Sequence, residues 1–175
     1  MTATKKSSPK PRPRQPAPAA QVARGSATQV LRRFRVVFNA VKTHFRQVEK
    51  HVGMGGAQLW ALSVVRAQPD IGMTGLAQAM DVHQSTASNL VKSLVERELI
   101  AAARHGADRR KVTLRVLPKG LRVLQKAPGP FAGVLPQAVS SLDAATLARL
   151  DEDLGRLIAA LHADGRAARI PLAQI

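Results

Sequence analysis

Polar side chains able to form hydrogen bonds with nucleic-acid bases line one side of a predicted helix over residues 84–97. At 100° per residue, the core side of this helix holds Ala87, Leu90, Val91, Leu94 and Val95. The opposite side holds Ser85, Ser88, Asn89, Lys92 and Ser93, with Gln84 at the exposed start. Asn and Gln can pair bidentately with adenine, Ser can donate to bases or phosphates, and Lys can reach guanine or phosphate. A polar face is also common on ordinary solvent-exposed helices, so the surrounding elements must decide between the two.

Two strands and a basic loop are predicted directly after this helix. Residues 99–103 and 112–116 form a hairpin in which alternate residues of the second strand, beginning with Val112, point inward. The loop between them, RHGADRRK, is rich in Arg and Lys, and a basic hairpin tip can insert Arg into a narrow minor groove. Asp108 either orients Arg110 or simply ends the turn. The candidate DNA-binding residues of the helix and the hairpin are Gln84, Ser85, Thr86, Ser88, Asn89, Lys92, Arg104, Asp108, Arg109, Arg110 and Lys111.

A shorter helix precedes the polar one. Residues 74–80 have helical character with Thr74 as a candidate cap, and a short connection from Asp81 to His83 joins the two helices. This arrangement is typical of a helix-turn-helix. Further helices are predicted around it, over residues 57–66, over residues 118–127 and from Phe131 onward.

Two amphipathic helices flank these central elements. The N-terminal one carries apolar residues at helical spacing from Val30 to Val48, and the C-terminal one carries them from Leu147 to Leu161. Asp143 is placed to cap the second of these helices. The apolar stripes favour dimerisation through the terminal helices, while packing within one chain explains them equally well.

The charge balance of the chain favours a polyanion as its partner. The 175 residues include 27 Lys and Arg against 11 Asp and Glu, with a formal net charge of +16 and a pI of about 11.7. The length suits a single domain with a sizeable core. An acidic membrane would also attract this charge, but the sequence contains neither an apolar run of spanning length nor a secretory signal, so we expect no membrane partner and a cytoplasmic location. Cysteine is absent, which excludes disulfides and Cys-based zinc sites.

The sequence is predicted to divide into a tail, one folded domain and a second tail. Residues 1–27 are rich in Pro, Lys, Arg, Ala and Ser and contain no acid, so we expect them to be disordered. This tail either solubilises the chain or adds phosphate contacts. The folded domain is expected over residues 28–165, followed by a C-terminal tail at 166–175. Its predicted parts are a DNA-binding lobe at about 55–118 and dimerisation helices at about 28–51 and 119–163.

Three segments carry the pattern of one known family. They are GMGGAQLWALSVV, MTGLAQAMDVHQSTASNLVKSLVERELI and ADRRKVTLRVLPKG, and the pattern continues in outline over about residues 30–162. Its more specific features are the pair Leu76 and Ala77, the STAS-x-LV-x-x-L core of the polar helix, and Asp108 with Arg110. Together these segments resemble the MarR family of winged helix-turn-helix transcriptional regulators. The chain departs from the family at His83, where a small cap is usual, and at Leu117, where Thr is common.

The resemblance implies a mainly α fold with a small β-hairpin wing, in which the N- and C-terminal helices form an obligate homodimer. It implies that residues 84–97 enter the major groove of a pseudopalindromic operator and that the wing with Arg110 enters the minor groove. It also implies a small ligand, often an aromatic acid or phenol, that weakens DNA binding. Family geometry places His44, His51 and Trp60 near the ligand pocket, where His can pair with a carboxylate and Trp can stack. Alternatively, Trp60 belongs to the core and both His residues to the surface or an interface.

We expect no metal, no cofactor and no enzymatic activity. The five His residues are scattered, and a metal site needs three or four convergent ligands. The sequence contains no phosphate-binding Gly loop, no nucleophile elbow and no paired carboxylates in a plausible pocket.

The sequence therefore predicts a sequence-specific transcriptional regulator, a homodimeric repressor that a small ligand releases from double-stranded DNA. One alternative is an architectural winged-helix protein that coats DNA with little sequence preference. Another is a protein-binding antagonist that no longer binds DNA.

Overall fold

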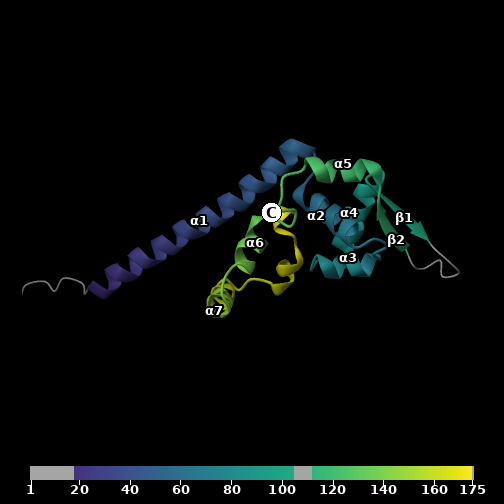
Figure 1. Ribbon diagram of the computed structural model, residues 1–175. Coiled ribbons are helices and arrows are strands. Elements are labelled where there is room, and N and C mark those ends of the chain that lie inside the picture. Colours follow the sequence, from purple (N-terminus) through teal and green to yellow (C-terminus); the bar gives the residue numbers. More distant parts are fainter. Residues whose placement is uncertain (1–17, 105–111, 175) are drawn as a thin grey trace, which may run out of the picture. The chain divides into compact units, whose positions relative to one another are not determined.

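The computed structural model describes residues 18–104 and 112–174, without the side chains of residues 18–26, 104 and 166. Its elements are helices α1 (Pro18–Val52), α2 (Gly56–Ala67), α3 (Met73–Ala79) and α4 (Gln84–Glu96), strands β1 (Ile100–Arg104) and β2 (Val112–Val116), helices α5 (Pro118–Lys126), α6 (Val134–Ser140) and α7 (Ala144–Ala160), and short 3₁₀ helices η1 (Gly165–Arg169) and η2 (Leu172–Gln174) (Figure 1). The predicted fold class, mainly helical with a β-hairpin wing, is confirmed. The chain divides into two compact units, residues 1–36 and 37–175.

The first unit contains the N-terminal part of α1, which begins earlier than the sequence predicts. Residues 18–27 were predicted to be disordered, but the helix starts at Pro18, so this boundary was wrong. Pro is well suited to the first turn of a helix, and the Ala residues that follow have the highest helix propensity, which offsets the lack of an apolar stripe there. Val30, Leu31 and Val36 of this unit are exposed. The predicted disorder of residues 1–17 lies outside the described residues.

The core of the second unit lies between α2, α3, α4 and the hairpin. The largest fully buried side chains are Leu59, Leu62, Leu76, Met80, Leu94, Ile100, Leu114, Val48 and Val65. Each of these elements buries one face, because the apolar residues recur at the period of a helix or a strand. Val48 of α1 and Leu124 of α5 extend the core. This packing fixes the direction in which the opposite face of α4 points.

The two strands form the predicted antiparallel hairpin, with Ile100 opposite Val116 and Arg104 opposite Val112. Leu114, at the centre of β2, is buried, whereas Arg115 beside it is exposed. The segment between α2 and α3 pairs with the outer edge of β2 through two backbone hydrogen bonds. Asp70 N–H donates to Leu114 O at 3.1 Å, and Leu114 N–H donates to Ile71 O at 3.0 Å. The base of the wing is thereby attached to the helices.

A close backbone approach joins α5 to the hairpin. Leu117 N–H donates to Leu99 O at 2.9 Å, and a Cβ added at Gly120 would lie 2.3 Å from the same Leu99 oxygen. Only glycine fits at this point of the helix.

Two predicted helix caps have different outcomes. The prediction for Thr74 was wrong, because α3 begins one residue earlier and its N-cap position is Gly72, without a side-chain cap. The prediction for Asp143 is confirmed, because Asp143 Oδ1 accepts from Thr146 N–H at 2.9 Å and Oδ2 accepts from the Thr146 hydroxyl at 2.7 Å. These two bonds lower the pKa of the Asp143 carboxyl.

The C-terminal residues, predicted as a plain tail, instead form η1 and η2 and return to the core. Pro171 is buried, and Ala173 packs against the core cluster beside α2. A Cβ added at Gly56 would lie 3.1 Å from the Ala173 methyl group. The tail prediction failed because the stretch is too short and too irregular to show a helical period. Across the described residues, no helix combines the length and the apolar character that a membrane crossing requires.

Candidate nucleic-acid interface

The exposed face of α4 carries the polar side chains that the sequence predicts there. Ala87, Leu90, Val91 and Leu94 are buried. The exposed residues on the other side of the helix are Gln84, Ser85, Ser88, Asn89 and Lys92, and Thr86 is half-buried. The structure therefore presents amide, hydroxyl and ammonium groups together on one surface, each able to bond to a base edge or a phosphate.

Two residues of α4 do not lie where the 100° projection places them. Ser93, predicted on the polar face, is half-buried, and its hydroxyl accepts from Gln58 Nε2 at 2.7 Å. Gln58 Oε1 in turn accepts from Gly55 N–H at 3.2 Å, so one amide caps α2 and also bonds to α4. Val95, predicted toward the core, is 39% exposed, whereas its neighbour Leu94 is fully buried.

Two features of α4 leave donor groups that can bind an anion. At the start, the N-cap residue His83 makes no side-chain cap, as its departure from the usual small cap predicts. An uncapped start leaves N–H groups that can bind water or an anion such as phosphate. Toward the end, Lys92 Nζ lies 4.0 Å from Glu96 Oε1, and both side chains are largely exposed. An exposed pair of this kind holds its partners loosely, so the Lys92 ammonium can turn toward another anion.

The wing is described only at its base. Arg104 pairs through its backbone with Val112 at the end of the hairpin. The predicted site residues of the loop, Asp108, Arg109, Arg110 and Lys111, lie outside the described residues, as does the side chain of Arg104.

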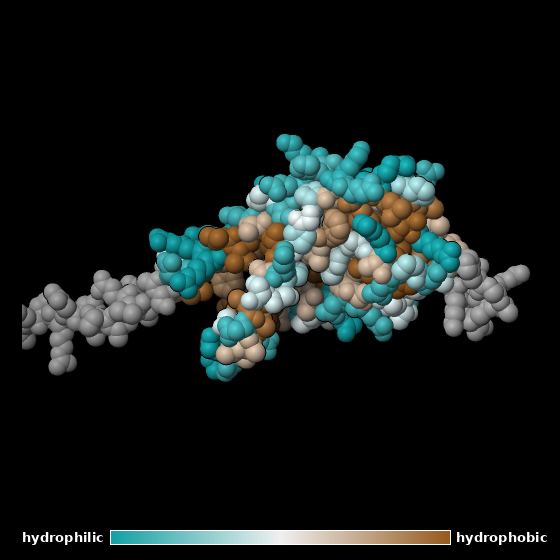
Figure 2. Space-filling model, viewed as in Figure 1, coloured by the Kyte–Doolittle hydropathy of each residue, from teal (hydrophilic) through white to brown (hydrophobic). Residues whose placement is uncertain are grey.

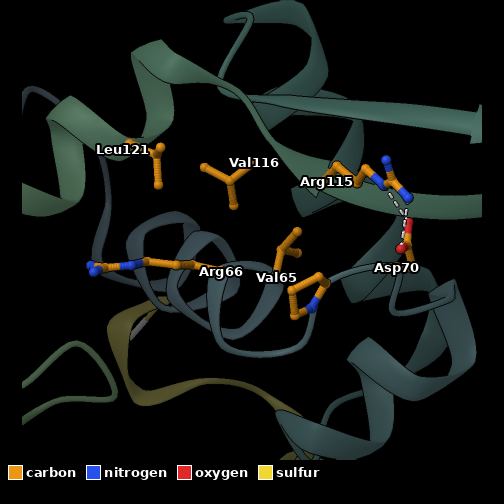
Figure 3. A pocket seen from close by; sticks show the side chains of 7 residues that line it. Val65, Arg66, Asp70, Arg115, Val116 and Leu121 are labelled. Carbon is orange, nitrogen blue, oxygen red and sulfur yellow. Dashed lines mark hydrogen bonds and ion pairs between the residues drawn. The ribbon is translucent and has the colours of Figure 1, made fainter.

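An ion pair that the sequence does not reveal holds the base of the wing. Arg115 Nη2 donates to Asp70 Oδ2 at 2.9 Å, and Arg115 Nε donates to Asp70 Oδ1 in a second, parallel bond. Figure 3 shows the two side chains pointing toward one another beside Val116. The carboxylate raises the pKa of the Arg115 guanidinium. Asp70 has a positive φ of 65°, in the turn after Pro69, and no local pattern connects that turn with a distant strand.

The three predicted ligand residues are not brought together. His44 is only 7% exposed, and its Nε2 donates to Pro130 O at 3.0 Å. His51 is exposed and bonds through Nδ1 to Gln47 O of its own helix at 2.8 Å. Trp60 is half-buried against the core cluster. These contacts are those of structural and surface groups.

A mainly apolar cavity of about 390 Å³ lies elsewhere along α1. Its apolar lining includes Phe38, Val41, Phe45 and Leu172, and its polar lining includes Asn39, Lys42, Arg46 and Glu49. Neither His44, His51 nor Trp60 lines it. The sequence does not predict this cavity, because η2 closes one side of it and the return of the C-terminal residues has no sequence signal. Among the described residues, no group of three His, Asp or Glu side chains is placed to hold a metal ion.

A helix-turn-helix formed by α3 and α4, followed by the hairpin, defines the winged helix-turn-helix class. Residues 52–111 match the model of the MarR family. The part of the chain that carries α2, α3, α4 and β1 thus matches the MarR family, in agreement with the resemblance given by its motifs.

Known proteins similar to this chain include one sequence relative and several solved structures. A protein of Thauera aromatica, named as a transcriptional regulatory protein for the hcr operon, is 34% identical over 101 residues. The match spans 57% of this chain and 56% of that protein. A MepR-like protein solved in complex with pseudoligands has a TM-score of 0.53 at 20% identity, covering 77% of this chain and 92% of that one. The MepR–DNA complex of S. aureus has a TM-score of 0.52 at 18% identity, covering 73% and 93%. At these identities the two structures show a shared fold.

Proposed function

We propose that this protein is a sequence-specific, DNA-binding transcriptional regulator. The observation that carries the proposal is that α4 has two different faces. Its buried apolar face fixes the helix against the core, while the opposite face presents short polar side chains to solvent. Gln84 and Asn89 are proposed to read adenine, Ser85, Thr86 and Ser88 to contact bases or phosphates, and Lys92 to reach a guanine or a phosphate. The wing residues Arg104, Asp108, Arg109, Arg110 and Lys111 are proposed to position the protein on the DNA backbone and in the minor groove.

The protein is further proposed to act as a homodimeric repressor in the cytoplasm. Apolar side chains are exposed on α1, including Val30 and Leu31, on α7, including Ile158 at 49%, and at the C-cap of α7, where Leu161 is 66% exposed. Figure 2 shows hydrophobic residues at the surface beside hydrophilic ones on the part that Figure 1 labels α7. Exposed apolar stripes of this kind are typical of helices that pack against a partner. A two-fold dimer would present two α4 helices to the half-sites of a pseudopalindromic operator.

The proposed ligand site is the cavity along α1, because its volume suits a small molecule. Lys42 and Arg46 stand at its polar side and could pair with an anionic group, while Phe38 and Phe45 could pack against an apolar or aromatic body. His44 adjoins this site through Phe45, whose ring lies 5.3 Å from the His44 ring between centroids. A ligand role for His44, His51 or Trp60 stays a prediction.

The experiment that tests the proposed function compares two DNA fragments at one fixed salt concentration. One fragment is the promoter region of a gene that neighbours the coding sequence of this protein, and the other is its scrambled counterpart. A specific regulator should bind the first about 10³–10⁷ times more tightly than the second. Equal affinities for every neighbouring promoter and its scrambled counterpart would overturn the proposal.

The net charge of +16 favours a second candidate, an architectural protein that coats DNA. Such binding comes from phosphate contacts, so its affinity falls steeply with salt, with a slope of about 0.9 per neutralised phosphate, and differs little between sequences. The same two-fragment measurement, repeated over a range of salt concentrations, separates the two candidates.

A further inference from the structure

A second polar surface adjoins the start of α4. It is a hollow of about 460 Å³ whose polar lining comes from four parts of the chain. The residues are Thr74 and Gln78 of α3, Asp81 and His83 of the connecting turn, Gln84 of α4, and Arg169 of η1. The first five belong to the helix-turn-helix, whereas Arg169 comes from the C-terminal segment.

The position of Arg169 depends on the residues that follow it. Pro171 is buried and Ala173 packs against the core cluster, so the segment after Arg169 is attached to α2. Ile170 N–H donates to Ala167 O at 3.1 Å and Gln174 N–H donates to Pro171 O at 2.9 Å, which keeps both 3₁₀ turns closed. A cation on such an anchored turn loses less conformational freedom on binding than one on a free tail.

The hollow lies where a DNA backbone would pass. In a helix-turn-helix, the first helix crosses the sugar–phosphate backbone while the start of the second enters the major groove. Here α3 is the first helix and Gln84 begins the second, and both border the hollow.

We propose that Arg169 is a further DNA-binding residue, whose guanidinium contacts a backbone phosphate beside the start of α4. The inference rests on the proposed function of α4 and adds to it a contact supplied by the C-terminal segment. Arg169 is exposed, and among the described residues its guanidinium forms no ion pair. It also offsets the negative charge of Asp81, which would otherwise repel a phosphate at the same hollow.

The contact is of the positioning kind and carries no base information. The substitution Arg169→Gln should therefore weaken binding to the promoter fragment and to its scrambled counterpart by similar factors. Loss of one phosphate contact lowers the salt slope by about 0.9, which amounts to roughly five- to tenfold in affinity at 0.1 M salt. Arg169→Lys keeps the charge and should retain most of the affinity, since Lys also binds phosphate as a point charge.

The measurement is DNA affinity of the full chain as a function of salt concentration. The matched control is Arg122→Gln, which removes the same charge from an exposed site on α5 that does not line the hollow. Thermal unfolding checks that each variant is folded, which we expect because both Arg side chains are exposed.

The outcomes separate this inference from the proposed function. If the unsubstituted protein prefers the promoter and Arg169→Gln behaves as Arg122→Gln does, Arg169 has no DNA contact and only the inference fails. An altered sequence preference with an unchanged salt slope would also overturn the phosphate contact. If the unsubstituted protein has no sequence preference, the proposed regulator fails, while the salt slopes still decide the contact of Arg169.

Discussion

At the scale of residues, short side chains distinguish the exposed face of α4 from an ordinary solvated helix face. Ser and Asn have few rotamers to lose, so a base contact costs them less conformational entropy than it costs a Lys or Glu. The buried residues Leu90 and Leu94 hold the helix from behind, and Gln58 ties it to α2 through Ser93. A rigid helix with small polar groups can approach base edges closely, whereas a face covered by long charged chains would stop at the phosphates.

Asn89 is the residue on which sequence preference should depend most. Asn89→Ala removes a side chain that can bond to both N6 and N7 of adenine. We expect preference at one operator position to weaken by about 1–3 kcal/mol, while the salt dependence of binding changes little. Affinities for operators substituted at each position in turn measure this effect.

Asn39→Ala is the matched control for Asn89→Ala, because Asn39 is exposed on α1 and lines the cavity there. It should leave the base preference of every operator position unchanged. If Asn89→Ala and the unsubstituted protein have the same base preference at every operator position, Asn89 does not read the sequence.

At the scale of elements, helix ends and backbone contacts fix how α4 and the wing are presented. The hairpin is attached to the α2–α3 segment by backbone bonds and by the Asp70–Arg115 pair, and α5 closes against Leu99 at the other side. Each contact joins elements that are not neighbours in sequence. The wing base therefore depends on tertiary contacts more than on the intrinsic stability of a two-stranded hairpin.

Among these contacts, the approach of Gly120 to Leu99 leaves the least space for a side chain. Gly120→Ala would place a methyl group 2.3 Å from Leu99 O, so α5 or β1 must move. Overpacking of this kind should lower the free energy of unfolding by about 1–3 kcal/mol. The control is Gly155→Ala in α7, where an added Cβ meets nothing within 4 Å and should stabilise the helix slightly. Urea unfolding of both variants measures the difference, and equal stabilities would show that the close contact is absent.

The cap of α7 should make stability depend on pH. Because the cap bonds lower the pKa of Asp143 in the folded state, the stability that the carboxylate contributes is complete above its pKa in the unfolded chain, about 4. It should be lost as pH falls further, through the pKa in the folded state. Asp143→Ala should have a lower Tm at pH 7, and its deficit relative to the unsubstituted protein should shrink toward pH 3.

Thermal unfolding from pH 7 to pH 3 tests the prediction for Asp143. Asp143→Asn keeps a cap acceptor without the titrating group. Its Tm at pH 7 should therefore lie between those of Asp143→Ala and the unsubstituted protein. Asp151→Asn, an exposed substitution in the middle of the same helix, serves as the control for charge removal. A deficit of Asp143→Ala that stays constant over this range would contradict the role of the carboxylate.

At the scale of the whole molecule, the sequence predicts best what depends on local periodicity. The helices α2, α4 and α5, the hairpin and the Asp143 cap follow from apolar spacing, strand alternation and capping chemistry within a few residues. Ser93, Asp70 and η2 were not predictable in this way, because their partners Gln58, Arg115 and the core beside Gly56 are distant in sequence. The cavity was missed for the same reason, and the Pro-rich composition before α1 concealed its early start.

The exposed apolar face of α7 should determine the oligomeric state. Leu161→Asp places a charge at the C-cap of α7, where an apolar side chain is 66% exposed, and a dimer interface there should lose most of its affinity. The control Ala159→Asp puts the same charge at an exposed position about 160° around the helix. Sedimentation or light scattering should show monomers for the first and dimers for the second. If both remain dimers, α7 does not supply the interface.

The N-terminal residues separate specific recognition from coating at the level of the whole chain. Residues 1–17 contain the cations Lys5, Lys6, Lys10, Arg12 and Arg14 and no acid. Deleting them should reduce affinity for scrambled DNA and the salt slope, since each lost phosphate contact lowers that slope by about 0.9. The ratio of promoter to scrambled affinity should stay nearly constant, because the exposed polar face of α4, which is proposed to read bases, is intact. If the cations of the tail account for most of the binding, both affinities collapse to the same low value, and the DNA-coating function becomes the better description of this protein.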